Sequence, residues 1–173
     1  MVKKLAFLLI LLFSLCLAGC SAREQQLPDY QSKAFDAQAT LEVNGEKYSV
    51  SIKKRADEGY VLSFLSPETI KGVTIEKSPE GLFFSSGSVR VPVNEGSNIT
   101  AETLKLFELP RSDLQSVTPE MLGGVKVNTS FYKCDFGTVK VFLSYDTGLP
   151  VVMEANIMGT DVRLSFSEFN VIS

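Results

Sequence analysis

From Ala34 onward, apolar and polar side chains alternate along the chain with the period of two that is typical of half-buried β-strands. The first run places Phe35, Leu41 and other apolar residues on one face, and a second run follows the pair Asn44-Gly45. An Asn-Gly pair between two such runs is the strongest short-range signal for a hairpin. The segment from Ala34 to Lys54 is therefore predicted to form a β-hairpin.

The same alternation recurs through most of the remaining chain. Turn clusters such as Asp57-Glu58-Gly59 and Pro79-Glu80-Gly81 separate the runs from one another. Further runs lie at residues 60–65, 73–77, 82–84, 89–93, 125–131, 138–145, 151–157 and 161–169. About nine or ten short strands joined by tight turns predict a meandering antiparallel sheet.

One interval, Asn98 to Met121, lacks this alternation. Leu104 and Phe107 stand at helical spacing within it, so we expect one or two short helices there, with Asn98 or Thr100 as the N-cap of the first. The predicted fold class is mainly β: a curved antiparallel sheet packed on one or two short helices, in a single domain.

The first 33 residues have a different composition. Lys3 and Lys4 precede an almost unbroken apolar stretch from Leu5 to Leu17, which is the layout of a secretory signal. The stretch is shorter than the run of about 20 residues with which a helix crosses a bilayer. The polar residues that follow predict a flexible stalk without core residues. We therefore expect a signal peptide at residues 1–19, a stalk at 20–33 and one β domain at 34–173.

The apolar stretch ends in Leu17-Ala18-Gly19-Cys20, which resembles the lipobox of bacterial lipoproteins. The resemblance implies cleavage before Cys20 and acylation of that cysteine, and two or more acyl chains hold a protein firmly on a bilayer. The alternative is an ordinary signal peptide in which Cys20 is incidental. With lipidation, the protein is anchored to the cell membrane or outer membrane and faces away from the cytoplasm.

Charge and composition exclude several classes of function. The chain has 17 Lys and Arg against 20 Asp and Glu, and removal of Lys3 and Lys4 with the signal leaves 15 against 20, a net charge of −5. Binding to a nucleic-acid backbone needs a basic face, so nucleic acid is not an expected partner. Histidine is absent, which removes the commonest general base and zinc ligand.

Cys134 is the one cysteine that neither leaves with the signal nor carries the expected lipid. It is either a packed, idle thiol or a reactive nucleophile, and thiolate catalysis normally needs a base or a positive neighbour. We find no catalytic constellation, cofactor motif or metal-ligand spacing. The sequence therefore predicts a protein without enzymatic activity, cofactor or metal.

Aromatic bulk is the remaining feature, with 12 phenylalanines, 5 tyrosines and no tryptophan. These residues either fill the core beneath the helical interval or leave a cavity that accepts acyl chains.

Several stretches of the mature chain resemble the LolA/LolB family of lipoprotein carriers and its relatives among Gram-positive and mycobacterial lipoproteins. They are the opening hairpin from Ala34 to Lys54, the strand, proline turn and short strand from Phe64 to Val73, and the closing stretches from Val141 to Pro150 and from Val162 to Ser167. The resemblance implies an incomplete antiparallel β-barrel wrapped over helices, an apolar cavity for acyl chains of lipids or lipoproteins, and no enzymatic activity.

We therefore expect a membrane-anchored lipoprotein that binds or shields a hydrophobic ligand, namely lipid or lipoprotein acyl chains. The alternative is a structural or interaction lipoprotein with a filled core that acts on a protein partner in the envelope. The expected ligand site lies between the helical interval and the sheet. It comprises Leu62, Phe64, Val89, Val91, Leu104, Phe107 and Val141.

Overall fold

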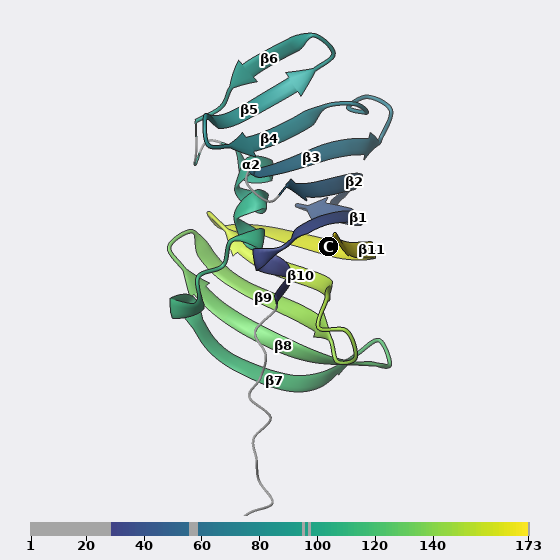
Figure 1. The fold of residues 1–173 in the computed structure, drawn as a ribbon, viewed down its shortest axis with the longest axis vertical. Helices are drawn as coiled ribbons and strands as arrows, with labels where there is room; N and C mark the ends of the chain where they lie inside the picture. The colour runs from purple at the N-terminus through teal and green to yellow at the C-terminus, as the bar shows by residue number, and fades with distance from the viewer. Residues whose placement is uncertain (1–28, 56–58, 95, 97, 173) are drawn as a thin grey trace, which may run out of the picture.

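A computed structural model describes residues 29–55, 59–94, 96 and 98–172, which form one curved sheet of eleven strands (Figure 1). The strands are β1 (Ala34–Val43), β2 (Glu46–Arg55), β3 (Gly59–Ser66), β4 (Thr74–Ser78), β5 (Gly81–Ser86), β6 (Val89–Pro92), β7 (Leu114–Leu122), β8 (Val125–Cys134), β9 (Gly137–Ser144), β10 (Pro150–Ile157) and β11 (Thr160–Ile172). The helical elements are η1 (Asp29–Ser32), α2 (Ile99–Glu102), η2 (Thr103–Phe107) and η3 (Arg111–Asp113).

The sheet consists of two meanders joined side by side. Its spatial order is β6-β5-β4-β3-β2-β1-β11-β10-β9-β8-β7, so only the β1–β11 pair joins strands that are distant in the sequence. All pairs are antiparallel, and β6 and β7 form the two edges. Figure 1 shows α2 and the chain that follows it lying across the region between the meanders. The predicted fold class, a curved and unclosed antiparallel sheet over short helices, is confirmed.

The predicted opening hairpin is present. β1 and β2 pair along nearly their whole length, from Phe35 opposite Lys54 to Val43 opposite Glu46. Asn44 and Gly45 both have positive φ angles, 52° and 81°, as a two-residue hairpin turn with the twist of the flanking strands requires. The turn chemistry thereby fixes the register that places the apolar face of β1 inward.

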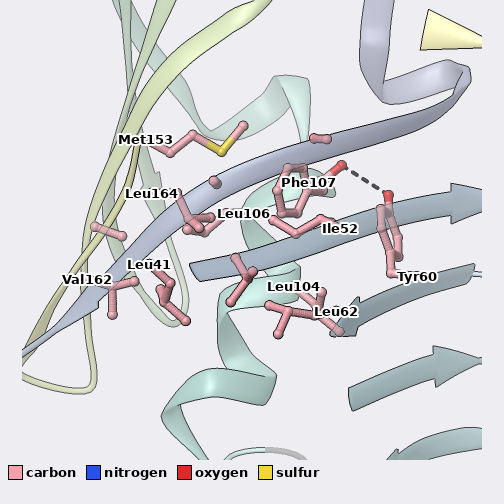
Figure 2. Packing of buried hydrophobic residues seen from close by; sticks show 14 of the residues in the cluster. Leu41, Ile52, Tyr60, Leu62, Leu104, Leu106, Phe107, Met153, Val162 and Leu164 are labelled. Atoms are coloured by element: carbon pink, nitrogen blue, oxygen red, sulfur yellow. Dashed lines mark hydrogen bonds between the residues drawn. The ribbon is translucent and has the colours of Figure 1, made fainter. Parts of the chain in front are cut away.

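The core lies between the concave face of the sheet and the helical segment. Rows of directly opposed residues cross the strands, such as Ile52 opposite Leu62 and Leu62 opposite Ile75, and all three are fully buried. Leu104 and Phe107 of η2 point onto these rows and are also fully buried (Figure 2). Complete burial of a side chain of this size contributes about 1.5–3 kcal/mol.

The start of the helical segment is fixed by its N-cap. The Asn98 side-chain oxygen accepts hydrogen bonds from the amides of Thr100 at 2.9 Å and Ala101 at 3.2 Å. This arrangement satisfies two of the amide groups that a helix leaves unpaired at its start. The expected cap is therefore confirmed for Asn98.

The second half of the expected helical interval is a strand, so the prediction was wrong there. β7 runs from Leu114 to Leu122 and pairs with β8 at the edge of the sheet. Most of its side chains are exposed, which removes the alternation by which a strand is identified. Pro119 is tolerated because edge strands can spare an amide donor.

The expectation that residues up to Lys33 carry no core residue was also wrong. Tyr30, in η1, is 2% exposed and packs edge-on against Phe169 at a ring distance of 5.5 Å. A single aromatic residue in a polar stretch creates no periodicity, so the pattern could not reveal it. The packed domain therefore extends at least to η1, while the expected signal peptide and the stalk up to residue 28 lie outside the described residues.

We predict that Tyr30→Ala destabilises the domain by about 3–5 kcal/mol, because the substitution leaves a large cavity in the core. Urea denaturation measures the change. The matched control is Tyr145→Ala, since Tyr145 is 43% exposed and its ring face contacts the Lys126 ammonium. Tyr145→Ala should lower the free energy of unfolding by no more than about 1 kcal/mol. Equal costs for the two variants would show that η1 does not belong to the core.

Candidate functional site

The seven residues of the predicted ligand site lie in three different settings within the described structure. Leu62, Leu104, Phe107 and Val141 are fully buried in the close-packed core. Val89 and Val91 are 60% and 47% exposed on the edge strand β6, where the register sets Val91 opposite Phe84. Phe64, at 6% exposure, lines an apolar pocket, and one edge of the buried Phe107 lines a second pocket described below.

That pocket lies where the helical segment begins. It has a volume of about 470 Å³. Its walls come from the β1–β2 hairpin, β3, the loop before β4, β5 and the first turn of α2. It is lined by Val43, Asn44, Glu46, Tyr48, Phe64, Ile70, Val73, Phe84, Ile99 and Thr100.

Two features shape the apolar wall. The rings of Tyr48 and Phe64 meet edge to face, with their centroids 5.7 Å apart and their planes at 82°. The loop before β4 folds back onto Phe64, whose amide donates to the Val73 carbonyl at 2.9 Å and whose carbonyl accepts from the Gly72 amide at 3.0 Å. These bonds hold Ile70 and Val73 against the pocket.

Sequence reasoning missed most of this lining. Tyr48 stands in period two with Val50 and Ile52, so the alternation carried a signal that it shares their face. Ile70 and Ile99 lie in a loop and at a helix start, where no periodicity points to a common surface. The remaining wall forms only when the chain folds.

The mouth of the pocket is polar and carries a negative charge. The Tyr48 hydroxyl donates a hydrogen bond to the Glu46 carboxylate, and this bond raises the pKa of Tyr48 above its ordinary value. Asn44 and Thr100 also face the pocket. The site can therefore take up an apolar group, and a carboxylate at the mouth disfavours an anionic group beside it.

The centre of the concave face is filled, and the helical segment is held firmly over it. The Glu102 carboxylate is buried, accepts the Gly96 amide at 2.7 Å and pairs with Lys105 at 2.7 Å. At the other end, the Tyr60 hydroxyl donates to the Phe107 carbonyl at 3.2 Å (Figure 2). The helical segment is thereby fixed at both ends.

A second pocket, of about 540 Å³, opens where the helical segment ends. It contains several charged side chains and is lined by Gln31, Lys54, Arg55, Gly59, Tyr60, Lys77, Ser78, Pro79, Phe107, Glu108 and Leu109. The two pockets therefore lie at opposite ends of α2 and η2, and they differ in chemistry.

Cys134 has the environment of an unreactive thiol. Burial raises its pKa to about 11, and a hydrogen bond and the negative charge of Asp113 act in the same direction, as does the charge of Asp135. Thiolate chemistry needs the opposite shift. Among residues 29–55, 59–94, 96 and 98–172, no group of three or more cysteine, aspartate or glutamate side chains is arranged to hold a metal ion.

Solved structures with a similar fold were found by comparison. An uncharacterized conserved protein from Thermus thermophilus superposes with a TM-score of 0.54 at 11% identity, over 85% of this chain and 83% of that chain. MucB superposes with a TM-score of 0.55 at 16% identity, over 85% of this chain and 56% of MucB. The LolA superfamily protein NE2245 from Nitrosomonas europaea gives 0.45 at 9% identity, over 82% of this chain and 87% of that chain, which is too low a TM-score to support an inference.

No family model matches the chain, and no curated protein matches it in sequence. The first two likenesses show a shared fold and nothing beyond it, because one fold hosts many functions. The chain corresponds to little more than half the length of MucB. Within the described residues, no helix is long and apolar enough to span a membrane.

We predict that Cys134 reacts slowly with iodoacetamide at neutral pH, and that the rate rises with pH towards a midpoint of about 11. The sign follows from the raised pKa, which keeps the thiol protonated below that value. Peptide mass spectrometry measures the rate at this cysteine alone. Asp113→Asn removes an acidic neighbour and should lower the midpoint. A midpoint in the parent near the ordinary value of about 8.5 would contradict the prediction.

Proposed function

We propose that this protein binds an apolar chain of a lipid or lipoprotein in the pocket at the start of the helical segment. The pocket itself carries the proposal. Its volume of about 470 Å³ falls within the range of about 300–1,000 Å³ that is typical of small-molecule sites. Aliphatic and aromatic side chains make most of its wall, with a few polar groups at the mouth.

The group at the mouth of the pocket favours an uncharged ligand end. The Glu46 carboxylate stands there beside the Tyr48 hydroxyl, so a free carboxylate on the ligand would meet a like charge. An acyl chain attached through an ester or amide carries no such charge. The proposed ligand is therefore an esterified or amide-linked chain rather than a free fatty acid.

We further propose that Cys20 is lipidated and anchors the domain to a membrane on the side away from the cytoplasm. The support is the sequence Leu17-Ala18-Gly19-Cys20 at the end of an apolar stretch with basic residues before it. The half-open sheet over short helices is also the architecture implied by the resemblance to LolA/LolB carriers. Anchoring would hold the apolar pocket close to its source of lipid.

An interaction protein without a ligand is the second candidate, and a specific observation favours it. Leu104, Leu106 and Phe107 are fully buried and fill the centre of the concave face, where a longer acyl chain would otherwise lie. In that case an envelope partner would dock along β7, an edge strand that pairs with β8 on one side only. Ligand uptake by the parent protein separates the two candidates.

We predict that Cys20→Ala abolishes incorporation of a radiolabelled fatty acid into the protein, because the acylated side chain is removed. Metabolic labelling followed by gel electrophoresis measures the incorporation. Cys134→Ala is the matched control and should keep full labelling. Equal labelling of the Cys20 variant and the parent would refute lipidation at this position.

We predict that Ile70→Trp lowers the affinity for a fluorescent fatty-acid methyl ester by about tenfold or more, since the larger ring fills the pocket. Fluorescence titration measures the affinity. Ile70 is half-buried in a loop, so the substitution should change the stability of the domain little. Leu65→Trp is the matched control, because Leu65 is 42% exposed and points away from the face of Phe64. Unchanged affinity in the Ile70 variant, or no saturable uptake by the parent, would count against the pocket.

A further inference from the structure

The pocket at the end of the helical segment has an unusual charge for this protein. The whole chain has more acidic than basic residues, 20 against 17. Among the side chains that line this pocket, Lys54, Arg55 and Lys77 are basic and Glu108 alone is acidic. Residues 56–58, which include Asp57 and Glu58, lie outside the described part of the chain. Basic groups therefore outnumber acidic ones among the described side chains that line this cavity of about 540 Å³.

The sheet itself turns two of these lysines inward. The register sets Lys54 of β2 opposite Tyr60 of β3, and Tyr60 opposite Lys77 of β4. All three side chains therefore project from the concave face, where the next row holds Ile52 and Leu62. Lysine is rarely placed towards a core unless the ammonium group has a role or a partner there.

The partners of the two lysines differ. Lys77 pairs with the Glu108 carboxylate. Lys54 donates to the uncharged carbonyl oxygen of Gln31 and lies over the Tyr60 ring, with its nitrogen 5.4 Å from the centroid. No carboxylate of the described residues lies within ion-pair distance of Lys54. Burial lowers the pKa of Lys54, while the charge of Glu108 acts in the opposite direction. A bound anion would relieve the cost of this burial further.

The place of this pocket in the chain connects it to the proposed anchor. Gln31 belongs to η1, the first described element, and Asp29 begins that element nine residues after Cys20. Nine residues span at most about 30 Å when extended. Lipidation at Cys20 would therefore keep this pocket within reach of the headgroups of the anchoring membrane.

We propose that this charged pocket binds the phosphate of an anionic membrane lipid headgroup, with Lys54 and Lys77 as the charged ligands. The choice of a lipid as the source of the phosphate rests on the proposed membrane anchoring. The apolar pocket is separate, because Leu104 and Phe107 fill the core between the two sites. The headgroup site and the acyl-chain site can therefore succeed or fail independently.

The test uses the full chain in a detergent with an uncharged headgroup. Binding is monitored through the amide NMR signals of Tyr60 and Glu108. The probes are dihexanoyl phosphatidylglycerol, dihexanoyl phosphatidylcholine and inorganic phosphate. We expect saturable shifts with phosphatidylglycerol and much weaker ones with the other two. Shifts confined to Ile99, at the apolar pocket, would report acyl-chain binding only, and would overturn the headgroup site while sparing the proposed function.

Lys54→Gln should weaken phosphatidylglycerol binding by about tenfold or more, as expected for loss of a charge-assisted hydrogen bond. The matched control is Lys53→Gln, which makes the same change in charge on the preceding residue of β2, where the exposed side chain faces away from the pocket. It should leave the affinity unchanged within about twofold. Equal loss in both variants would reduce the effect to general charge attraction and overturn the site. Inorganic phosphate that binds as tightly as the lipid would overturn the lipid as its source.

Discussion

The concave face of this curved sheet is apolar and has to be shielded from water. The rest of the structure depends on the segment that covers it. The cover is a single short segment, residues 99–107, which carries Leu104, Leu106 and Phe107 onto the concave face. Isolated helices of this length are marginal in water, so the segment owes its shape to what it touches. Asn98 fixes its start and Tyr60 fixes its end.

The two pockets follow from the shortness of this cover. One opens beside Ile99, where the segment begins, and the other beside Phe107, where it ends. Between them the core is tightly packed, so a single acyl chain cannot run from one pocket to the other. The sheet adds the chemical difference, since its outer rows supply aromatic rings at one end and the ammonium groups of Lys54 and Lys77 at the other.

Local signals in the sequence were sufficient for most of the architecture but not for the sites. Asn44-Gly45 predicts the first turn because few other pairs accept two positive φ angles, and Asn98 predicts a cap because its side chain replaces missing backbone acceptors. β7 was missed because an exposed edge strand has no apolar face, and Tyr30 because one buried residue leaves no pattern. Lys54 follows Ile52 by two positions, so its inward direction was readable from the alternation. Which inward residues become core and which line a cavity depends on where the cover ends, and that is a property of the folded chain.

The β1–β11 pair has a consequence for the order in which the chain can fold. Every other strand pair joins neighbours in the sequence, so each meander can form from local contacts alone. β1, however, finds its second partner only when β11, which ends at Ile172, comes back to it. Until then β1 is an open edge with free backbone donors and acceptors, the kind of edge that pairs with other chains. The chain is therefore most exposed to aggregation in the interval before β1 and β11 pair.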